Sequence, residues 1–128
     1  MTKMSVPGAF LSIFLLAAQG AGAGEEWRQL KFDSRHSGDA AERSVATPLG
    51  LLAAVPLSDA VFAAPAVADG KAFVPDGSGV LWAIDTETFQ VAWRFATPGG
   101  PLNCNNVSSP AIVDRYVHFG TMAGDYFV

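Results

Sequence analysis

The chain has 128 residues, of which 50% are hydrophobic, and its formal net charge is −4. This composition is typical of a globular protein and excludes a disordered one. The mildly acidic balance argues against nucleic-acid binding, which needs a basic face, and the single cysteine, Cys104, excludes an internal disulfide bond.

Residues 1–23 are predicted to be a signal peptide. Lys3 precedes an apolar run over 6–18, and Ala21 and Ala23 form the small-x-small pattern that signal peptidase recognises. We therefore expect the mature chain to begin near Gly24 and to be periplasmic or secreted. The apolar run is shorter than the roughly 18 residues that a membrane span needs, so no stable span is expected after signal removal. An uncleaved anchor helix is the alternative.

Residues 24–48 are expected to form an extended lead-in that ends in a loop, because Trp27 and Phe32 stand among polar residues without any periodicity. From residue 49 onward, short apolar runs alternate with turn signals, which is typical of an all-β chain. The run 50–57 is the first candidate strand. Gly or Pro interrupts every window with helical spacing, so little helix is expected beyond the signal segment.

The next strands are predicted from turn dipeptides and alternation. The run 63–67 ends at Asp69-Gly70, a dipeptide that supplies the positive φ angles of a tight hairpin, and the chain returns through 71–74. The segment "PDGSG" is a second turn. The strand "VLWAID" follows, with its apolar residues Val80, Trp82 and Ile84 on one face.

The strand "QVAWRFA" closes this series. Its alternation predicts that Val91, Trp93 and Phe95 face one way, and that Gln90 and Arg94 face the other.

An internal repeat with an offset of 45 residues relates two parts of the chain. The segment "PAVADGKAFVPDGSGVLWA" from Pro65 aligns without gaps on "PAIVDRYVHFGTMAGDYFV" from Pro110, with the proline, the hairpin aspartate and a glycine conserved between them. A period of about 40–45 residues with four short strands is typical of a β-propeller blade. We therefore expect an all-β fold of antiparallel blades, a partial β-propeller of about two blades, preceded by a signal-peptide helix.

The segment "APAVADGKAFVPDGSGVLWAIDTETFQVAW" resembles the repeat of the pyrroloquinoline-quinone-type (PQQ-like) β-propellers. The resemblance covers residues 49–128, with repeats near 58–102 and 103–128. In that family a tryptophan docking motif runs Ala-x-Asp-x-x-Thr-Gly-Lys-x-x-Trp. Four residues of this chain match the motif: Ala83, Asp85, Thr88 and Trp93.

The motif has a local physical logic. The Asp85 carboxylate and the Thr88 hydroxyl are expected to accept hydrogen bonds within the turn. Trp93 is expected to lie between blades, where it would bury on the order of 200 Å², and Ala83 is small enough to let a neighbour approach. Phe89 stands where the family has glycine, at a position where positive φ costs a bulky residue roughly 1–2 kcal/mol, so a turn of different shape is an alternative.

No catalytic, cofactor-binding or metal-binding residue is predicted. The segment 76–79 lacks the third glycine and the following helix of a nucleotide-binding loop. His36 and His118 have no partner at metal-ligand spacing, and a structural role on a strand is the better interpretation of His118. Turn capping is preferred to calcium binding for four acids that lack the spacing of a calcium loop: Asp76, Asp85, Asp114 and Asp125.

Two functions agree with these features. The first is an exported, non-catalytic PQQ-like repeat protein or fragment, a binding or assembly scaffold without a cofactor, whose partner is a protein or the remaining blades of a longer chain. The alternative is the N-terminal fragment of a PQQ-dependent quinoprotein dehydrogenase, with PQQ and calcium bound on blades absent from this chain. The cysteine pair of the family's alcohol dehydrogenases is not carried over, because only Cys104 is present.

The second repeat stops before the position of its docking tryptophan. Repeat proteins gain much of their stability between neighbouring units, and about three units are usually needed. We therefore expect a fragment of a longer reading frame, or a chain that associates with its own copies, and not an autonomous folding unit.

Overall fold

The computed structural model describes residues 26–40, 44–98 and 108–128. These residues form no helix and seven β-strands: β1 (Ala66–Ala68), β2 (Lys71–Pro75), β3 (Val80–Asp85), β4 (Val91–Ala96), β5 (Ala111–Val113), β6 (Tyr116–Gly120) and β7 (Tyr126–Phe127). The all-β fold predicted from the sequence is confirmed. The predicted signal peptide over 1–23 and the loop with Cys104 lie outside the described residues.

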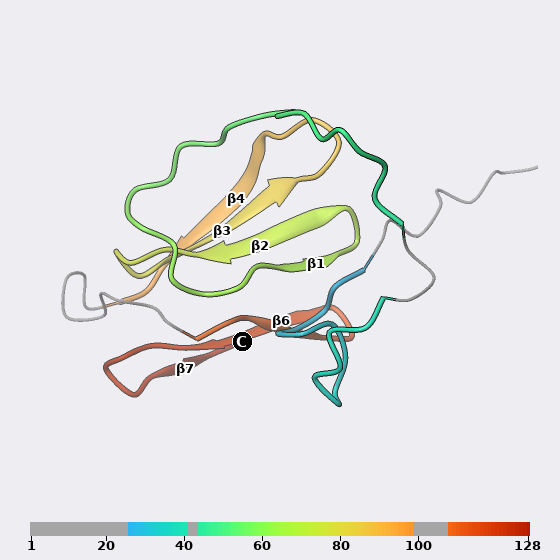
Figure 1. The fold of residues 1–128 in the computed structure, drawn as a ribbon. Helices are drawn as coiled ribbons and strands as arrows, with labels where there is room; N and C mark the ends of the chain where they lie inside the picture. Colours follow the sequence, from blue (N-terminus) through green and yellow to red (C-terminus); the bar gives the residue numbers. More distant parts are fainter. Residues whose placement is uncertain (1–25, 41–43, 99–107) are drawn as a thin grey trace, which may run out of the picture.

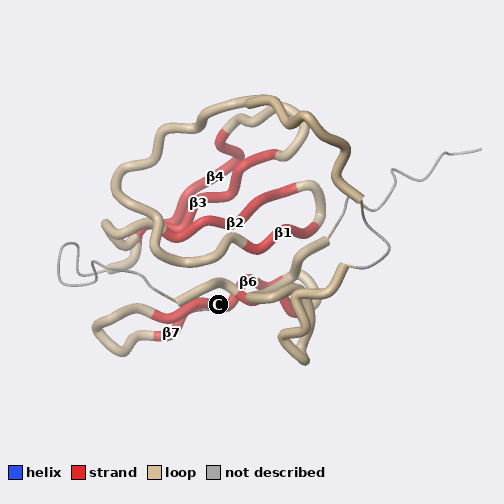
Figure 2. The backbone as a smooth tube through the Cα atoms, viewed as in Figure 1, coloured by secondary structure: helices blue, strands red, loops and turns tan. Residues whose placement is uncertain are grey.

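The strands form two antiparallel sheets. The first sheet has the order β1-β2-β3-β4, and the second has the order β5-β6-β7. Each is a simple meander in which consecutive strands are neighbours. Figure 1 shows the two sheets one above the other, and the long connection 44–65 arches over the side of the first sheet that faces away from the second. Figure 2 shows that this connection contains no strand.

The offset of 45 residues found in the sequence holds strand by strand. β5 and β6 begin and end 45 residues after β1 and β2, and β7 lies within the span 45 residues after β3. The backbone conformations repeat as well. Asp69 and Asp114 have φ angles of 49° and 53°, and Gly79 and Gly124 have φ angles of 85° and 87°.

Turn hydrogen bonds repeat with the same offset. The amide of Asp76 donates to the carbonyl of Val80 at 2.9 Å, and the amide of Thr121 donates to the carbonyl of Asp125 at 3.0 Å. The two sheets are therefore two copies of one structural unit.

The sheets pack through opposite faces of this unit. The second sheet buries Ile112 and Phe119 against the first sheet, with Val117 and Phe127 partly buried beside them. The positions 45 residues earlier lie on the outward face of the first sheet, because Ala66, Phe73 and Ala83, which pair across β1, β2 and β3, point inward. The stacking is thus front to back, as in consecutive blades of a propeller.

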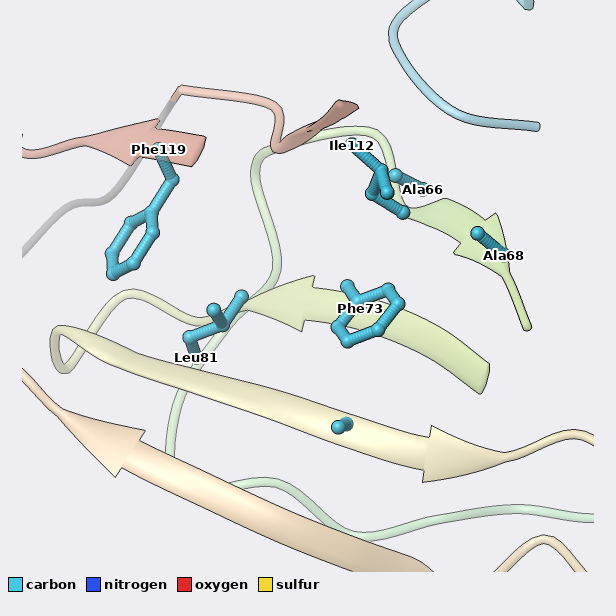
Figure 3. Close-up of a cluster of buried hydrophobic side chains, with 7 residues drawn as sticks. Ala66, Ala68, Phe73, Leu81, Ile112 and Phe119 are labelled. Carbon is cyan, nitrogen blue, oxygen red and sulfur yellow. The ribbon is translucent and has the colours of Figure 1, made fainter. Parts of the chain in front are cut away.

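Small and large apolar side chains fill the space between the sheets. Figure 3 shows Phe73 and Leu81 projecting from the first sheet toward the strands that carry Phe119 and Ile112. Phe95 of β4 lies 6.4 Å from Phe119 and 5.6 Å from Phe127, measured between ring centroids. Ala66 and Ala83 are completely buried, which allows these aromatic side chains to approach the backbone of the first sheet.

The lead-in segment lies between the first strands of the two units. Trp27 and Val67 exchange backbone hydrogen bonds of 2.7 and 2.8 Å, and the amide of Ile112 donates to the carbonyl of Arg28 at 2.7 Å. Val67 and Ile112 are equivalent positions of the two units. The lead-in segment therefore connects the two sheets by backbone hydrogen bonds, a role that its polar sequence does not predict.

Two details differ from the sequence-based expectations. The run 50–57 forms no strand, and Leu51 and Leu52 are 86% and 84% exposed. In β4, the pairing of Ala83 with Trp93 is followed by that of Ile84 with Val91, which marks a β-bulge. Because residues that pair across strands share a face, the bulge breaks the alternation predicted over 91–95.

Phe89 has a φ of 57°, in the left-handed region that favours glycine. Phe89 therefore adopts the conformation expected of the family's glycine at this position, although its side chain is bulky. A non-glycine residue pays roughly 1–2 kcal/mol for this conformation. Phe89→Gly should consequently be more stable than Phe89→Ala by about 1 kcal/mol, although glycine usually destabilises.

The comparison is made with the midpoints of urea unfolding followed by tryptophan fluorescence. The matched control is Glu87 in the same turn, which does not have a positive φ. Glu87→Gly should be no more stable than Glu87→Ala. Equal midpoints for the two Phe89 variants would contradict the positive φ at this turn.

Candidate functional site

The turn between β3 and β4 is organised by Asp85. Its Oδ1 accepts hydrogen bonds from the amides of Glu87 at 3.0 Å and Thr88 at 2.8 Å, and from the Thr88 hydroxyl at 2.9 Å. The hydrogen bonds from the amide and hydroxyl of Thr88, followed by that from Glu87, lower the pKa of Asp85 below its ordinary value. Two of the motif residues that the sequence singled out, Asp85 and Thr88, are thus in direct contact.

The other two motif residues meet farther along the same hairpin. Ala83 is directly opposite Trp93 in the β3–β4 pairing and is completely buried. The Trp93 ring packs 5.8 Å from the ring of Phe73 and remains 41% exposed. Trp93 therefore lies on the face of the first sheet that is turned toward the second sheet.

A second centre is formed by Asp76 at the turn between β2 and β3. Its side chain is completely buried. Oδ1 accepts hydrogen bonds from the amide and hydroxyl of Ser78 and from the amide of Val80, at 2.7–3.1 Å. Oδ2 accepts hydrogen bonds from the amide and hydroxyl of Ser58 and from the indole N–H of Trp82, at 2.6–3.2 Å.

These contacts determine the charge state of Asp76. Burial by itself raises the pKa of this carboxyl group, but the hydrogen bonds from Ser58, Ser78, Trp82 and Val80 outweigh burial, and the pKa lies below its ordinary value. Both oxygens are used by donors of the chain itself, so the carboxylate acts as a structural anion. Asp76 joins the connection 44–65 to the first sheet through Ser58.

An apolar groove opens beside Trp93, between β4 and the second sheet. Its volume is about 460 Å³. The residues that line it are Leu81, Trp93, Arg94, Phe95, Arg115, Tyr116, Val117, Phe119, Phe127 and Val128. The groove continues the apolar contact between the two sheets outward to the surface.

The remaining candidates are dispersed. Nδ1 of His118 on β6 lies 2.6 Å from the Tyr126 hydroxyl on β7, on the outward face of the second sheet, whereas His36 lies in the loop of the lead-in. Asp114 occupies the β5–β6 turn at positive φ. Over 26–40, 44–98 and 108–128, no three His, Cys, Asp or Glu residues gather as a possible metal site. No helix in this part of the chain is long and apolar enough to cross a membrane.

Two meander sheets that repeat every 45 residues and stack front to back define a partial β-propeller. A family model described as "Outer membrane protein assembly factor BamB" matches residues 51–127, which include all seven strands. The chain belongs to this family of PQQ-like repeat proteins. A search of curated proteins found no match.

The sequence predicted the residues of the β3–β4 hairpin and the turn-capping role of Asp76, but not the hydrogen bonds that Asp76 accepts from Ser58 and Trp82. The signal was present in part, since an aspartate followed by Gly-Ser-Gly predicts a capped turn. Nothing in the sequence linked that turn to Ser58, which lies 18 residues earlier. The hydrogen bond to Trp82 also required knowledge of which face of β3 the indole occupies.

The lowered pKa of Asp76 predicts how the stability of the fold changes as the pH falls. A carboxylate with a lowered pKa in the folded chain stabilises the fold above the pKa of the unfolded chain, about 3.9, and this contribution is lost as the pH falls through the folded-state value. Asp76→Asn should lower the free energy of unfolding at pH 7 by roughly 1–3 kcal/mol, because the amide group cannot accept all of these hydrogen bonds. The variant should also lose less stability than the original chain on further acidification.

Urea unfolding between about pH 7 and pH 3 measures both effects. The control is Asp114→Asn, which removes the same charge at a turn where asparagine tolerates the positive φ. This control should retain the acid sensitivity of the original chain. An Asp76→Asn chain with an unchanged pH profile would contradict the role assigned to this carboxylate.

Proposed function

We propose that the chain is an exported, non-catalytic PQQ-like repeat protein, or a piece of one, that acts as a protein-binding scaffold in the assembly of outer-membrane proteins. The observation that carries the proposal is the match of the family model to residues 51–127, across both sheets. The family is described as an assembly factor, and assembly is carried out through contacts between proteins.

Exposed side chains of the second sheet support a role in binding proteins. Val113, Tyr116 and Tyr126, on its outward face, are 56%, 49% and 68% exposed. Tyrosine is enriched at protein interfaces, because its ring supplies apolar area and its hydroxyl supplies a hydrogen bond. Exposed apolar patches of this kind mark interaction surfaces in soluble proteins.

The docking motif has a supporting role in this proposal. Asp85 and Thr88 hold the β3–β4 turn, and the bulge that follows it sets the orientation of Trp93. Trp93 then packs toward the neighbouring sheet, where it stabilises the contact between units. These residues thus build a stack of blades with outward faces available for partners, and take no part in chemistry.

The scaffold is proposed to work without a cofactor. Calcium requires several oxygen ligands, and the described residues do not fit it: the buried carboxylate of Asp76 already accepts six hydrogen bonds. Addition of PQQ and calcium should therefore change neither the visible absorbance nor the melting temperature of the chain. Saturable stoichiometric binding, with a rise in melting temperature that depends on ligand concentration, would favour the quinoprotein dehydrogenase instead.

The scaffold function is tested by expression in a bacterium that has an outer membrane. The chain should be recovered from the periplasm with an N-terminus near Gly24 by mass spectrometry, because Ala21 and Ala23 form the predicted cleavage site. A photo-crosslinking amino acid at Tyr126, on the outward face, should then give adducts with proteins of the outer-membrane assembly machinery.

Thr86, an exposed residue of the β3–β4 turn, is the control position for the crosslinker and should give no adduct. Replacing both Ala21 and Ala23 with leucine should block cleavage. Intact Met1 on a cytoplasmic chain, or equal adducts from both crosslinker positions, would overturn the proposal.

A further inference from the structure

The lead-in segment is attached to the sheets by contacts that the same segment of another copy could make equally well. Trp27 exchanges backbone hydrogen bonds of 2.7 and 2.8 Å with Val67, and the carbonyl of Arg28 accepts one of 2.7 Å from the amide of Ile112. The Arg28 guanidinium donates to the carbonyl of Asp114 at 3.2 Å. The backbone contacts use the edges of β1 and β5 that do not pair with β2 and β6. The attachment is therefore a strand pairing, which does not require both partners to belong to one chain.

The loop over residues 29–38, which we call the hinge loop, follows this pairing and has an unfavourable backbone conformation. Lys31, Phe32 and His36 have φ angles of 58°, 78° and 53°. This left-handed region is unfavourable for residues that carry a side chain, because the Cβ atom approaches the following carbonyl oxygen. In an extended loop the φ angles are negative. Opening of the hinge loop would therefore release this strain.

Hydrogen bonds to one carboxylate oppose the opening. Oδ1 of Asp33 accepts hydrogen bonds from the amides of Arg35 at 3.1 Å and Ser37 at 2.9 Å, and Oδ2 accepts one from the Ser37 hydroxyl at 3.0 Å. The amide of His36 donates to the carbonyl of Asp33 at 2.9 Å. These bonds all lie within the hinge loop. The closed loop is thus stabilised by Asp33 and destabilised by its own backbone angles.

A segment that pairs through its backbone and is joined to its chain by a strained loop is suited to exchange between two copies. The pairing is the same in both arrangements, so the conformation of the hinge loop decides between them. Fully extended, a loop of about ten residues spans roughly 33–36 Å. This length is comparable with the diameter of a small domain, about 30 Å. The lead-in of one copy can therefore reach β1 and β5 of another.

We propose that the partner of this surface is a second copy of the chain, in which the edges of β1 and β5 bind Trp27 and Arg28 of the other copy while the hinge loop opens to connect the two. The exchange is reciprocal and gives a closed dimer with two-fold symmetry. The proposal goes beyond the scaffold function and does not depend on it. It also uses no part of the outward face of the second sheet.

A photo-crosslinking residue identifies the origin of the paired segment. Benzoylphenylalanine replaces Trp27 and retains a large aromatic side chain. The whole chain with this residue is refolded together with an isotopically heavy chain that keeps Trp27. Mass spectrometry should find crosslinks from position 27 of the light chain to β1 of the heavy chain. Crosslinks confined to the light chain, or a dimer whose crosslinks avoid β1, would overturn the proposal.

Two substitutions in the hinge loop should change the dissociation constant of the dimer in opposite directions. Lys31→Gly should raise it roughly three- to tenfold relative to Lys31→Ala, because glycine relieves the strain of the closed loop in both chains. Asp33→Ala should lower it at least about tenfold, because the closed loop loses the hydrogen bonds that the carboxylate accepts. Sedimentation equilibrium measures the constants, and circular dichroism confirms that each variant retains its β-structure.

Matched controls separate the hinge from general effects of the substitutions. Arg35 lies in the same loop without a positive φ, so Arg35→Gly should not raise the dissociation constant relative to Arg35→Ala. Asp39→Ala removes the same charge as Asp33→Ala from an exposed position and should leave the constant unchanged. Absence of a dimer in both the original chain and Asp33→Ala would overturn the proposal, as would a shift in the same direction by Lys31→Gly and Asp33→Ala.

Discussion

A sheet with apolar side chains on both faces needs another part of the protein to cover each face. The rest of this structure depends on that constraint. The first sheet meets it on one side by stacking on the second, where Phe95, Phe119 and Phe127 form an aromatic cluster across the contact. On the other side lies the connection 44–65, which Asp76 attaches through Ser58. The second sheet has its inward face covered in the same way, while its outward face exposes Tyr116 and Tyr126.

This constraint explains why the two ends of the molecule differ in character. Front-to-back stacking uses one face of each unit to cover the other face of the next. The surface that remains open on the second sheet is therefore equivalent to the face that the first sheet buries.

The β3–β4 turn and the bulge in β4 support this stacking. Asp85 and Thr88 stabilise a turn in which Phe89 adopts a positive φ, and the bulge beyond it interrupts the alternation of β4. As a result Trp93 and Phe95 face the second sheet while Val91 lies opposite Ile84. The groove lies where these two aromatic side chains stand at the margin of the contact between the sheets.

The amino-acid sequence by itself determined the β class, the 45-residue period, the Asp69-Gly70 turn and the hairpin motif of Ala83, Asp85, Thr88 and Trp93. These features depend on the alternation of polar and apolar residues, on turn chemistry and on residues close together in the chain. All of these can be read directly from the sequence.

Only the tertiary structure decided the rest. Several contacts join residues that are far apart in the sequence. They are the hydrogen bonds from Ser58 and Trp82 to Asp76, the bridge from Trp27 to Val67 and the front-to-back contact between the sheets. The strand expected over 50–57 is absent, because an apolar run becomes a strand only when another strand offers it a ladder of hydrogen bonds. Strand pairing, register and bulges depend on which segments come into contact in the folded chain. The spacing of residues along the sequence does not predict these contacts.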